Sequence, residues 1–265
     1  MEMIHTFEPS SAKRMPSIVP CRPSLLRVVQ TEILPRLLIA HRPPRAVPFA
    51  SESADPERLA MLAMGPERDG AADYLSFLQR RGHSTQSLLL DLIAPAARHL
   101  GALWERDDCD FVQVTEGLGR LSAATQDLLA DSDFHVGANA PGHRVLIALA
   151  PGETHRLGAE MTQGMFRFAG FDAEFADDFE ARLGEAPYAL LGLSISCERF
   201  LDALAGAITA ARAASLNKSL VVFVGGPLVA GRADLAQNIG ADACVSDAST
   251  AVLLARGLIE SRNRM

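Results

Sequence analysis

Hydrophobic positions between residues 55 and 133 recur every three to four residues, which is the spacing of amphipathic helices. We expect four helices in this region. Ser84 is the predicted N-cap of the third, and Asp110 with Gln113 resembles a capping box that opens the fourth. Pro95 falls inside the third helix, where it should bend or break the helix. Because the links are short, the pattern predicts an antiparallel bundle.

From residue 142 to the end, short β-type runs alternate with amphipathic segments. Five β/α units of this length predict a doubly wound, mostly parallel sheet. The expected fold class is therefore α/β, with an N-terminal four-helix bundle cap followed by a Rossmann-like doubly wound parallel sheet. The expected strands cover 144–149, 171–175, 188–194, 219–224 and 242–245, and the expected helices cover 156–169, 178–184, 198–215, 230–238 and 248–260.

Residues 1–54 form a Pro-rich arm with little periodicity. Seven basic residues and one acidic residue between positions 11 and 45 give this stretch a charge of +6. Since the net charge of the whole chain is −7, the remaining residues carry a charge of −13. A basic arm on an acidic body can contact DNA or an acidic partner protein, and a solvated flexible arm is the simpler interpretation. No helix-turn-helix or zinc-finger pattern is present, so we expect any DNA contact to be indirect or to involve 11–45.

Composition is consistent with a cytoplasmic protein that has no membrane contact. The chain has 265 residues, of which 48% are hydrophobic, enough for a buried core. No apolar run reaches the length of a membrane span, and the start lacks the pattern of a signal peptide. Its four cysteines are scattered without a CxxC pair, which argues against a disulfide framework and a structural zinc site.

Candidate chemistry begins directly after the first expected strand, in the segment 151–158. His155 is placed there at the carboxyl edge of a parallel sheet, where open α/β folds bind ligands. Glu153 can hold one ring nitrogen and so determine which nitrogen faces a metal. This chemistry suits an axial ligand to cobalt or iron in a macrocycle, although a histidine at a strand end is often only a surface residue.

Two further strand ends carry small or polar residues. Ser194 and Ser196 follow the third expected strand, and Gly225 and Gly226 follow the fourth. Because the carboxyl ends of neighbouring parallel strands meet at one edge, these residues should converge with His155. Glycines allow a ligand to approach the backbone, and serines donate hydrogen bonds; a strand-to-helix turn and helix capping are the alternative explanations.

Together these segments resemble the cobalamin-binding domain with a helical cap, whose pattern is DxHxxG, then SxL, then GG. Two departures are evident, since Glu153 replaces the aspartate and Ser196 replaces the leucine. The resemblance implies that His155 displaces the lower base of cobalamin and binds cobalt, while the nucleotide tail enters the sheet domain. The matching cofactor-binding residues are Glu153, Thr154, His155, Arg156, Gly158, Ser194, Ser196, Gly225 and Gly226.

The cap segment 92–104 also resembles this family, in whose photoreceptors a Trp covers the upper axial group. Trp104 holds this place here, and the resemblance implies that Phe111, Val114 and Thr115 line the same ceiling. Those photoreceptors carry Glu-His where this chain has Val114-Thr115. Residues 104–115 and 31–38 look most similar to the AerR/PpaA regulators of purple photosynthetic bacteria.

The resemblance implies a non-enzymatic, light-responsive antirepressor that binds adenosyl- or hydroxocobalamin. Its implied partner is a PpsR/CrtJ-type repressor of photosynthesis genes. Two alternatives remain open: a corrinoid methyl carrier of a methyltransferase system, and a redox sensor in which His155 ligates heme. Imidazole serves cobalt and iron alike, but the glycine and serine elements suit a nucleotide tail that heme lacks.

Overall fold

The computed structural model describes residues 54–132, 144–232 and 234–263. The chain divides into two units, Met1–Ser53 and Ala54–Met265. The predicted arm over 1–54, including its basic part 11–45, therefore lies outside the described residues, apart from Ala54.

The N-terminal half of the described chain consists of helices, as predicted. Asp55 caps the first helix by accepting hydrogen bonds from the backbone N–H groups of Glu57 and Arg58. Ser84 caps the third in the same way, and Asp110 and Gln113 form the expected capping box at the start of the fourth. The helices are α3 (Pro56–Met64), α4 (Gly70–Arg80), a composite of α5 (Thr85–Ser87), the π-helical η2 (Leu88–Ile93) and α6 (Ala94–Glu105), and α7 (Phe111–Ala130).

Pro95 changes the hydrogen bonding of the third helix without ending it. Residues Leu88–Ile93 form a π-helical stretch, in which the Ala94 N–H donates to the carbonyl of Leu89, five residues back. A proline ring in an α-helix collides with the carbonyl four residues earlier and has no N–H to donate. The wider π turn gives the ring room, so the helix continues through α6.

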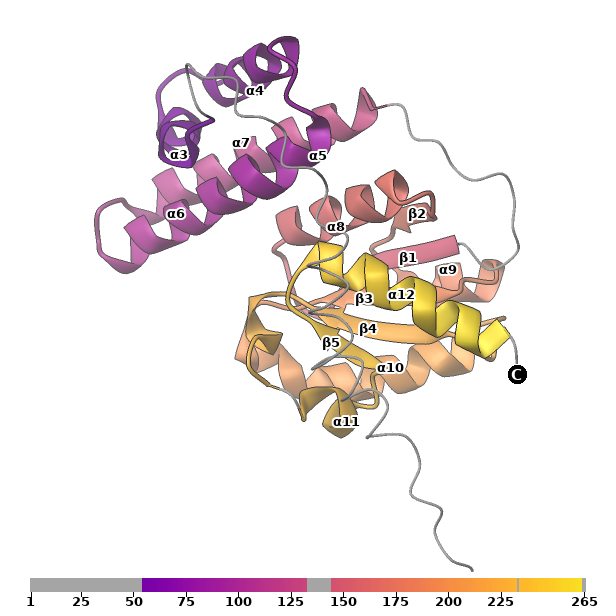
Figure 1. The fold of residues 1–265 in the computed structure, drawn as a ribbon. Coiled ribbons are helices and arrows are strands. Elements are labelled where there is room, and N and C mark those ends of the chain that lie inside the picture. The colour runs from indigo at the N-terminus through magenta and orange to yellow at the C-terminus, as the bar shows by residue number, and fades with distance from the viewer. Residues whose placement is uncertain (1–53, 133–143, 233, 264–265) are drawn as a thin grey trace, which may run out of the picture. The chain divides into compact units, whose positions relative to one another are not determined.

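The second half is a five-stranded parallel sheet in the order β2-β1-β3-β4-β5 (Figure 1). All four strand pairs are parallel, which confirms the doubly wound α/β fold. The strands are β1 (Arg144–Leu149), β2 (Asp172–Phe175), β3 (Leu190–Ser194), β4 (Val221–Gly225) and β5 (Ala243–Val245), and the helices are α8 (Leu157–Phe168), α9 (Phe179–Glu185), α10 (Leu201–Ala214), α11 (Leu235–Ile239) and α12 (Ala248–Asn263).

Helices cover both faces of the sheet. On one face α8 packs against β1 and β2 and contacts α12, whereas α10 contacts both α9 and α11 on the other face. The predicted helix over 230–238 is shorter than expected, since α11 covers only Leu235–Ile239; a separate 3-10 turn at Pro227–Val229 precedes it. No helix in the described part of the chain has both the length and the apolar character that a membrane span requires.

Helix α8 packs against both the bundle and the sheet. Met161 is buried in the same cluster as the apolar side chains of α3, α4, α6 and α7, although its helix also covers the sheet. Gly164 allows α7 to approach closely, because a Cβ at this position would collide with the side chain of Leu129. The loop that carries His155 therefore leads directly into a helix shared by the bundle and the sheet.

Candidate cofactor-binding site

The predicted site lies where the strand order reverses. β1 and β3 are neighbours in the sheet, but the chain leaves β1 toward α8 on one face and β3 toward α10 on the other. Ligands of open α/β folds bind at such a switch point, beyond the carboxyl ends of the strands. Both loops that meet here carry residues predicted from the sequence, His155 after β1 and Ser196 after β3.

A tight turn after β1 directs Glu153 inward. Gly152 adopts a positive φ of 84°, and the Glu153 N–H donates to the carbonyl of Ala150 at 2.9 Å. A side chain at Gly152 would meet the ring of Phe200, since a Cβ there lies 2.7 Å from the ring. As a result the Glu153 side chain is 1% exposed, whereas the His155 side chain is 58% exposed.

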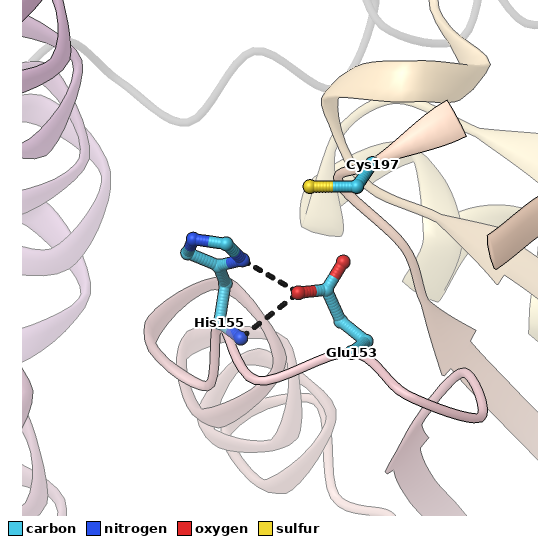
Figure 2. Close-up of side chains that lie close together, drawn as sticks. All are labelled: Glu153, His155 and Cys197. Carbon is cyan, nitrogen blue, oxygen red and sulfur yellow. Dashed lines mark hydrogen bonds and ion pairs between the residues drawn. The ribbon is translucent and has the colours of Figure 1, made fainter. Parts of the chain in front are cut away.

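The Glu153 carboxylate is the centre of the hydrogen-bond network at this switch point. Its Oε1 accepts from the backbone N–H groups of Thr154 (2.8 Å) and His155 (3.0 Å) and contacts His155 Nδ1 at 2.5 Å. Its Oε2 accepts from the backbone N–H and the hydroxyl of Ser196, both at 2.7 Å. Figure 2 shows the two hydrogen bonds that join Glu153 to His155. One buried carboxylate thus ties together the loops after β1 and β3.

These contacts keep Glu153 ionised. Burial alone would raise the pKa of this carboxyl, but the hydrogen bonds from Ser196 and His155 outweigh burial and lower the pKa from 4.5 to about 2. Since a carboxylate only accepts hydrogen bonds, its contact with the ring places a proton on His155 Nδ1. In the neutral ring the lone pair then resides on Nε2, which points away from Glu153 in Figure 2.

The side chains of Glu153, His155 and Ser196 are not arranged like a hydrolase triad. In such a triad the serine and the acid contact opposite nitrogens of the histidine. Here Ser196 Oγ and Glu153 Oε1 both lie near Nδ1, at 2.9 Å and 2.5 Å. Nε2 is therefore the nitrogen that is available to a ligand.

Glu153, His155 and Cys197 also form a group of potential metal ligands, whose ligand atoms lie within 4.8 Å of one another. An ion held by all three would have to compete with the hydrogen bonds that already occupy both carboxylate oxygens. Nε2 of His155 offers one nitrogen lone pair to a metal and does not have to give up a hydrogen bond of the Glu153 network. This donor set fits a metal whose remaining positions are filled by a macrocycle, as in a corrin or a heme.

The two glycines at the carboxyl end of β4 have different local constraints. Gly226 has a φ of 116°, and a Cβ there would collide with the backbone carbonyl of Ile195. Gly225 ends β4, and its added Cβ would only reach ordinary contact, 3.4 Å from the Val245 carbonyl oxygen. Close passage of the loops after β3 and β4 thus requires glycine at 226, and ligand contact at either glycine stays a prediction.

Other predicted residues have separate surroundings. Ser194 is the last residue of β3 and pairs with Leu149 of β1. Arg156 extends away from the Glu153 network, because its Nη1 donates to Asp177 Oδ1 at 2.6 Å. Thr154 contributes a backbone N–H to Glu153. Gly158 lies in the first turn of α8, where an added Cβ would meet nothing within 4 Å.

The residues predicted to cover the upper face of the cofactor lie on either side of the turn between α6 and α7. Trp104 and Phe111 are 51% and 69% exposed, and Thr115 is also exposed. Val114 is instead buried in the bundle core, with 6% exposure. The neighbouring Val112 is 62% exposed and was not predicted as part of this surface.

Sequence reasoning found Glu153 and His155 but missed part of what surrounds them. Ser196 was predicted as part of a motif, but its contacts with both Glu153 and His155 were not predicted. Sequence reasoning also missed Glu160, a buried acid of α8 that bonds to α7. The available signal was its position among the buried residues of α8, all the others of which are apolar.

The fold and the site define an α/β protein with a helical cap and a histidine at the topological switch point. The chain matches the structure of the Methanosarcina barkeri monomethylamine corrinoid protein with a TM-score of 0.61 and 17% identity, over 76% of this chain and 96% of that one. At this identity the likeness shows the fold alone. No family model matches the sequence.

A closer relationship comes from a protein of Rhodobacter capsulatus. The chain is 30% identical over 170 residues to the uncharacterized 20.5 kDa protein in the bchF-crtJ intergenic region, a match that covers 60% of this chain and 85% of that relative. The chain belongs to the same family as this protein.

Proposed function

We propose that this protein binds cobalamin and that His155 supplies the lower axial ligand. The observation that carries the proposal is the position of His155, whose Nδ1 is held by Glu153 while Nε2 points away from the network. A carboxylate that accepts a hydrogen bond from the other ring nitrogen fixes the tautomer of a metal-binding histidine and raises the basicity of the ligand nitrogen. The fold match to a protein named as a corrinoid protein supports the proposal.

We assign the other predicted residues to the remaining parts of this cofactor. The backbone near Gly225 and Gly226 and the hydroxyl of Ser194 are assigned to the nucleotide tail, which a heme does not have. Trp104, half exposed at the end of α6, is assigned to the upper face of the corrin, with Phe111 and Thr115 nearby in the chain. Cobalamin supplies a cobalt centre with an upper axial bond that light can break.

The biological role we assign is regulatory and non-enzymatic. The relative is named for its place between bchF and crtJ. The AerR/PpaA regulators, which this chain resembles, act on CrtJ-type repressors. We therefore infer that a PpsR/CrtJ-type repressor is the partner, and that cobalamin in its adenosyl or hydroxo form makes the interaction responsive to light.

The first experiment is an absorbance titration of the full chain with adenosyl- and hydroxocobalamin, in the dark and after green light. Wild type should retain a corrin spectrum that changes on illumination, whereas His155→Ala should lose the spectral signature of a histidine-bound cobalt. His83→Ala is the matched control, because His83 lies in the turn between α4 and α5. A wild-type protein that releases every corrinoid during gel filtration would refute the proposal.

The partner is tested separately by release of a PpsR/CrtJ-type repressor from its DNA. The full chain carrying cobalamin should release the repressor. A chain without residues 11–45 should release less if the basic arm contacts the repressor or its DNA. Unchanged release would remove the arm from the proposal but leave the cofactor site unaffected.

Heme is the second candidate cofactor, because a free imidazole Nε2 ligates iron as readily as cobalt. A Soret band that forms with hemin and depends on His155, together with loss of corrinoids, would favour a heme-based redox sensor. A corrinoid methyl carrier is the other candidate, supported by the match to the monomethylamine corrinoid protein. Methyl transfer to or from the bound cofactor without any effect on the repressor would favour the carrier.

A further inference from the structure

A buried acid connects the two helices that lie between the bundle and the sheet. Glu160 of α8 is 4% exposed. Its Oε2 accepts from the hydroxyl of Ser122 at 2.6 Å, and its Oε1 accepts from the side-chain amide of Gln126 at 2.7 Å. Both donors belong to α7, so the carboxylate depends on the bundle for its two shortest hydrogen bonds.

The same carboxylate also contacts the residue that follows His155. Arg156 Nε donates to Glu160 Oε1 at 3.4 Å. The guanidinium is further held by Asp177 and lies over the ring of Phe175, 4.3 Å from its centroid. Arg156 is therefore anchored between the sheet domain and Glu160. We call Ser122, Gln126, Arg156 and Glu160 the α7–α8 junction.

Packing around the junction leaves it little freedom. Leu129 of α7 lies against Gly164 of α8, and Met161 is buried among bundle side chains. A displacement of α7 along α8 would remove the two α7 donors of Glu160 and leave a buried acid with only its longer contact to Arg156, which is unfavourable. In the observed arrangement Gln126 and Arg156 share Glu160 Oε1, so a shift of α7 changes the hydrogen bonding of the oxygen that Arg156 contacts.

We propose that Glu160 is a positioning residue that couples the His155 loop to the packing of α7 on α8. A ligand that moves His155 shifts Arg156 and hence the hydrogen bonds of Glu160 with the bundle. By thermodynamic reciprocity, a partner that moves α7 changes ligand affinity by the same factor. The inference rests on the proposed function only for the identity of the ligand; the coupling itself is a property of this chain.

The coupling is tested first without any cofactor, by amide hydrogen exchange of the full chain. Gln126→Ala on α7 should accelerate exchange in residues 153–160 about fivefold, the effect of losing one net hydrogen bond. In a Glu160→Gln background the same change should have little further effect on 153–160. If Gln126→Ala leaves exchange in 153–160 unchanged, or acts equally in both backgrounds, Glu160 does not couple the two sites.

The second arm adds hydroxocobalamin to wild type, Glu160→Gln and the control Glu185→Gln, whose acid is exposed on α9. All three should bind with dissociation constants within about threefold, because the Glu153–His155 contact is untouched. Ligand-induced protection of residues 118–130 should appear in wild type and the control and fall by more than half in Glu160→Gln. Equal protection in all three proteins would overturn the inference while leaving the proposed function intact.

Absence of corrinoid binding in wild type would have the opposite meaning. The proposed function would then fail, and the exchange results on the cofactor-free variants would decide the coupling. A Glu160→Asp variant guards against simple loss of folding, since it keeps the charge and shortens the reach. It should restore part of the coupling if the carboxylate itself is responsible.

Discussion

Replacement of Glu153 by Gln tests whether the carboxylate, rather than the shape of the loop, organises the switch point. Both oxygens of Glu153 accept hydrogen bonds, from Thr154 and His155 on one side and Ser196 on the other. A glutamine amide has one oxygen, so its NH2 group must face donors on one of the two sides. The substitution should therefore destabilise the fold at neutral pH without changing side-chain volume.

The pKa of Glu153 gives the size and the pH dependence of this effect. Burial opposes ionisation, but the hydrogen bonds from Ser196 and His155 lower the pKa from 4.5 to about 2. A lowered carboxyl pKa stabilises the folded state above the unfolded pKa, and this stability is lost as the pH falls toward the folded pKa. The shift corresponds to about 3 kcal/mol at pH 7 and to roughly 1.5 kcal/mol at pH 3.

Urea unfolding at both pH values measures the free energy of unfolding for wild type and Glu153→Gln. Wild type should be more stable by about 3 kcal/mol at pH 7, and the difference should shrink by about half at pH 3. Glu185→Gln, at an exposed site, should stay within about 0.5 kcal/mol of wild type at pH 7. A difference that is equal at pH 7 and pH 3 would refute the linkage between the Glu153 network and stability.

Two further predictions concern the glycine and tryptophan positions. Gly226→Ala should destabilise the protein by about 3 kcal/mol, because of the positive φ and the collision with Ile195, whereas Gly225→Ala should cost under about 1 kcal/mol. Thermal unfolding distinguishes the two variants, and equal changes in melting temperature would contradict the geometry. Trp104 is the chain's only Trp, so the tryptophan fluorescence comes from this position alone, and hydroxocobalamin should quench it. Trp104→Ala should weaken cofactor binding and change the free energy of unfolding by less than about 1 kcal/mol, as expected for a half-exposed side chain. Unchanged emission at saturation would place the corrin away from α6.

Local signals explain why the fold could be predicted. The capping residues Ser84 and Asp110 act through hydrogen bonds to their own helices, so their effect is visible in a short stretch of sequence. The alternation of apolar β-runs with helical segments likewise identified all five strands of the sheet. The π-helical stretch before Pro95 was not anticipated, because several arrangements of the chain can relieve the same clash.

The site was predictable only where it follows from topology. Parallel strands bring their carboxyl ends to one edge, so the convergence of His155 and Ser196 could be expected. Val114 shows the limit: its position near Trp104 in the chain suggested the same surface, but the helical turn directs it into the bundle core. Side-chain direction depends on helix rotation, which short sequence patterns at a helix start determine poorly.

Glu160 shows why the relation between bundle and sheet could not be predicted. A buried acid is costly unless it is paired, and its partners here come from a helix more than thirty residues earlier, at separations of 38 and 34 positions. No periodic pattern marks such a pairing, because Ser122 and Gln126 are ordinary polar residues of α7. Yet the requirement that Glu160 be satisfied restricts how α7 lies on α8 more tightly than apolar contacts do, since hydrogen bonds are directional. The residue that sequence reasoning missed is thus the one through which a change at His155 can reach the bundle.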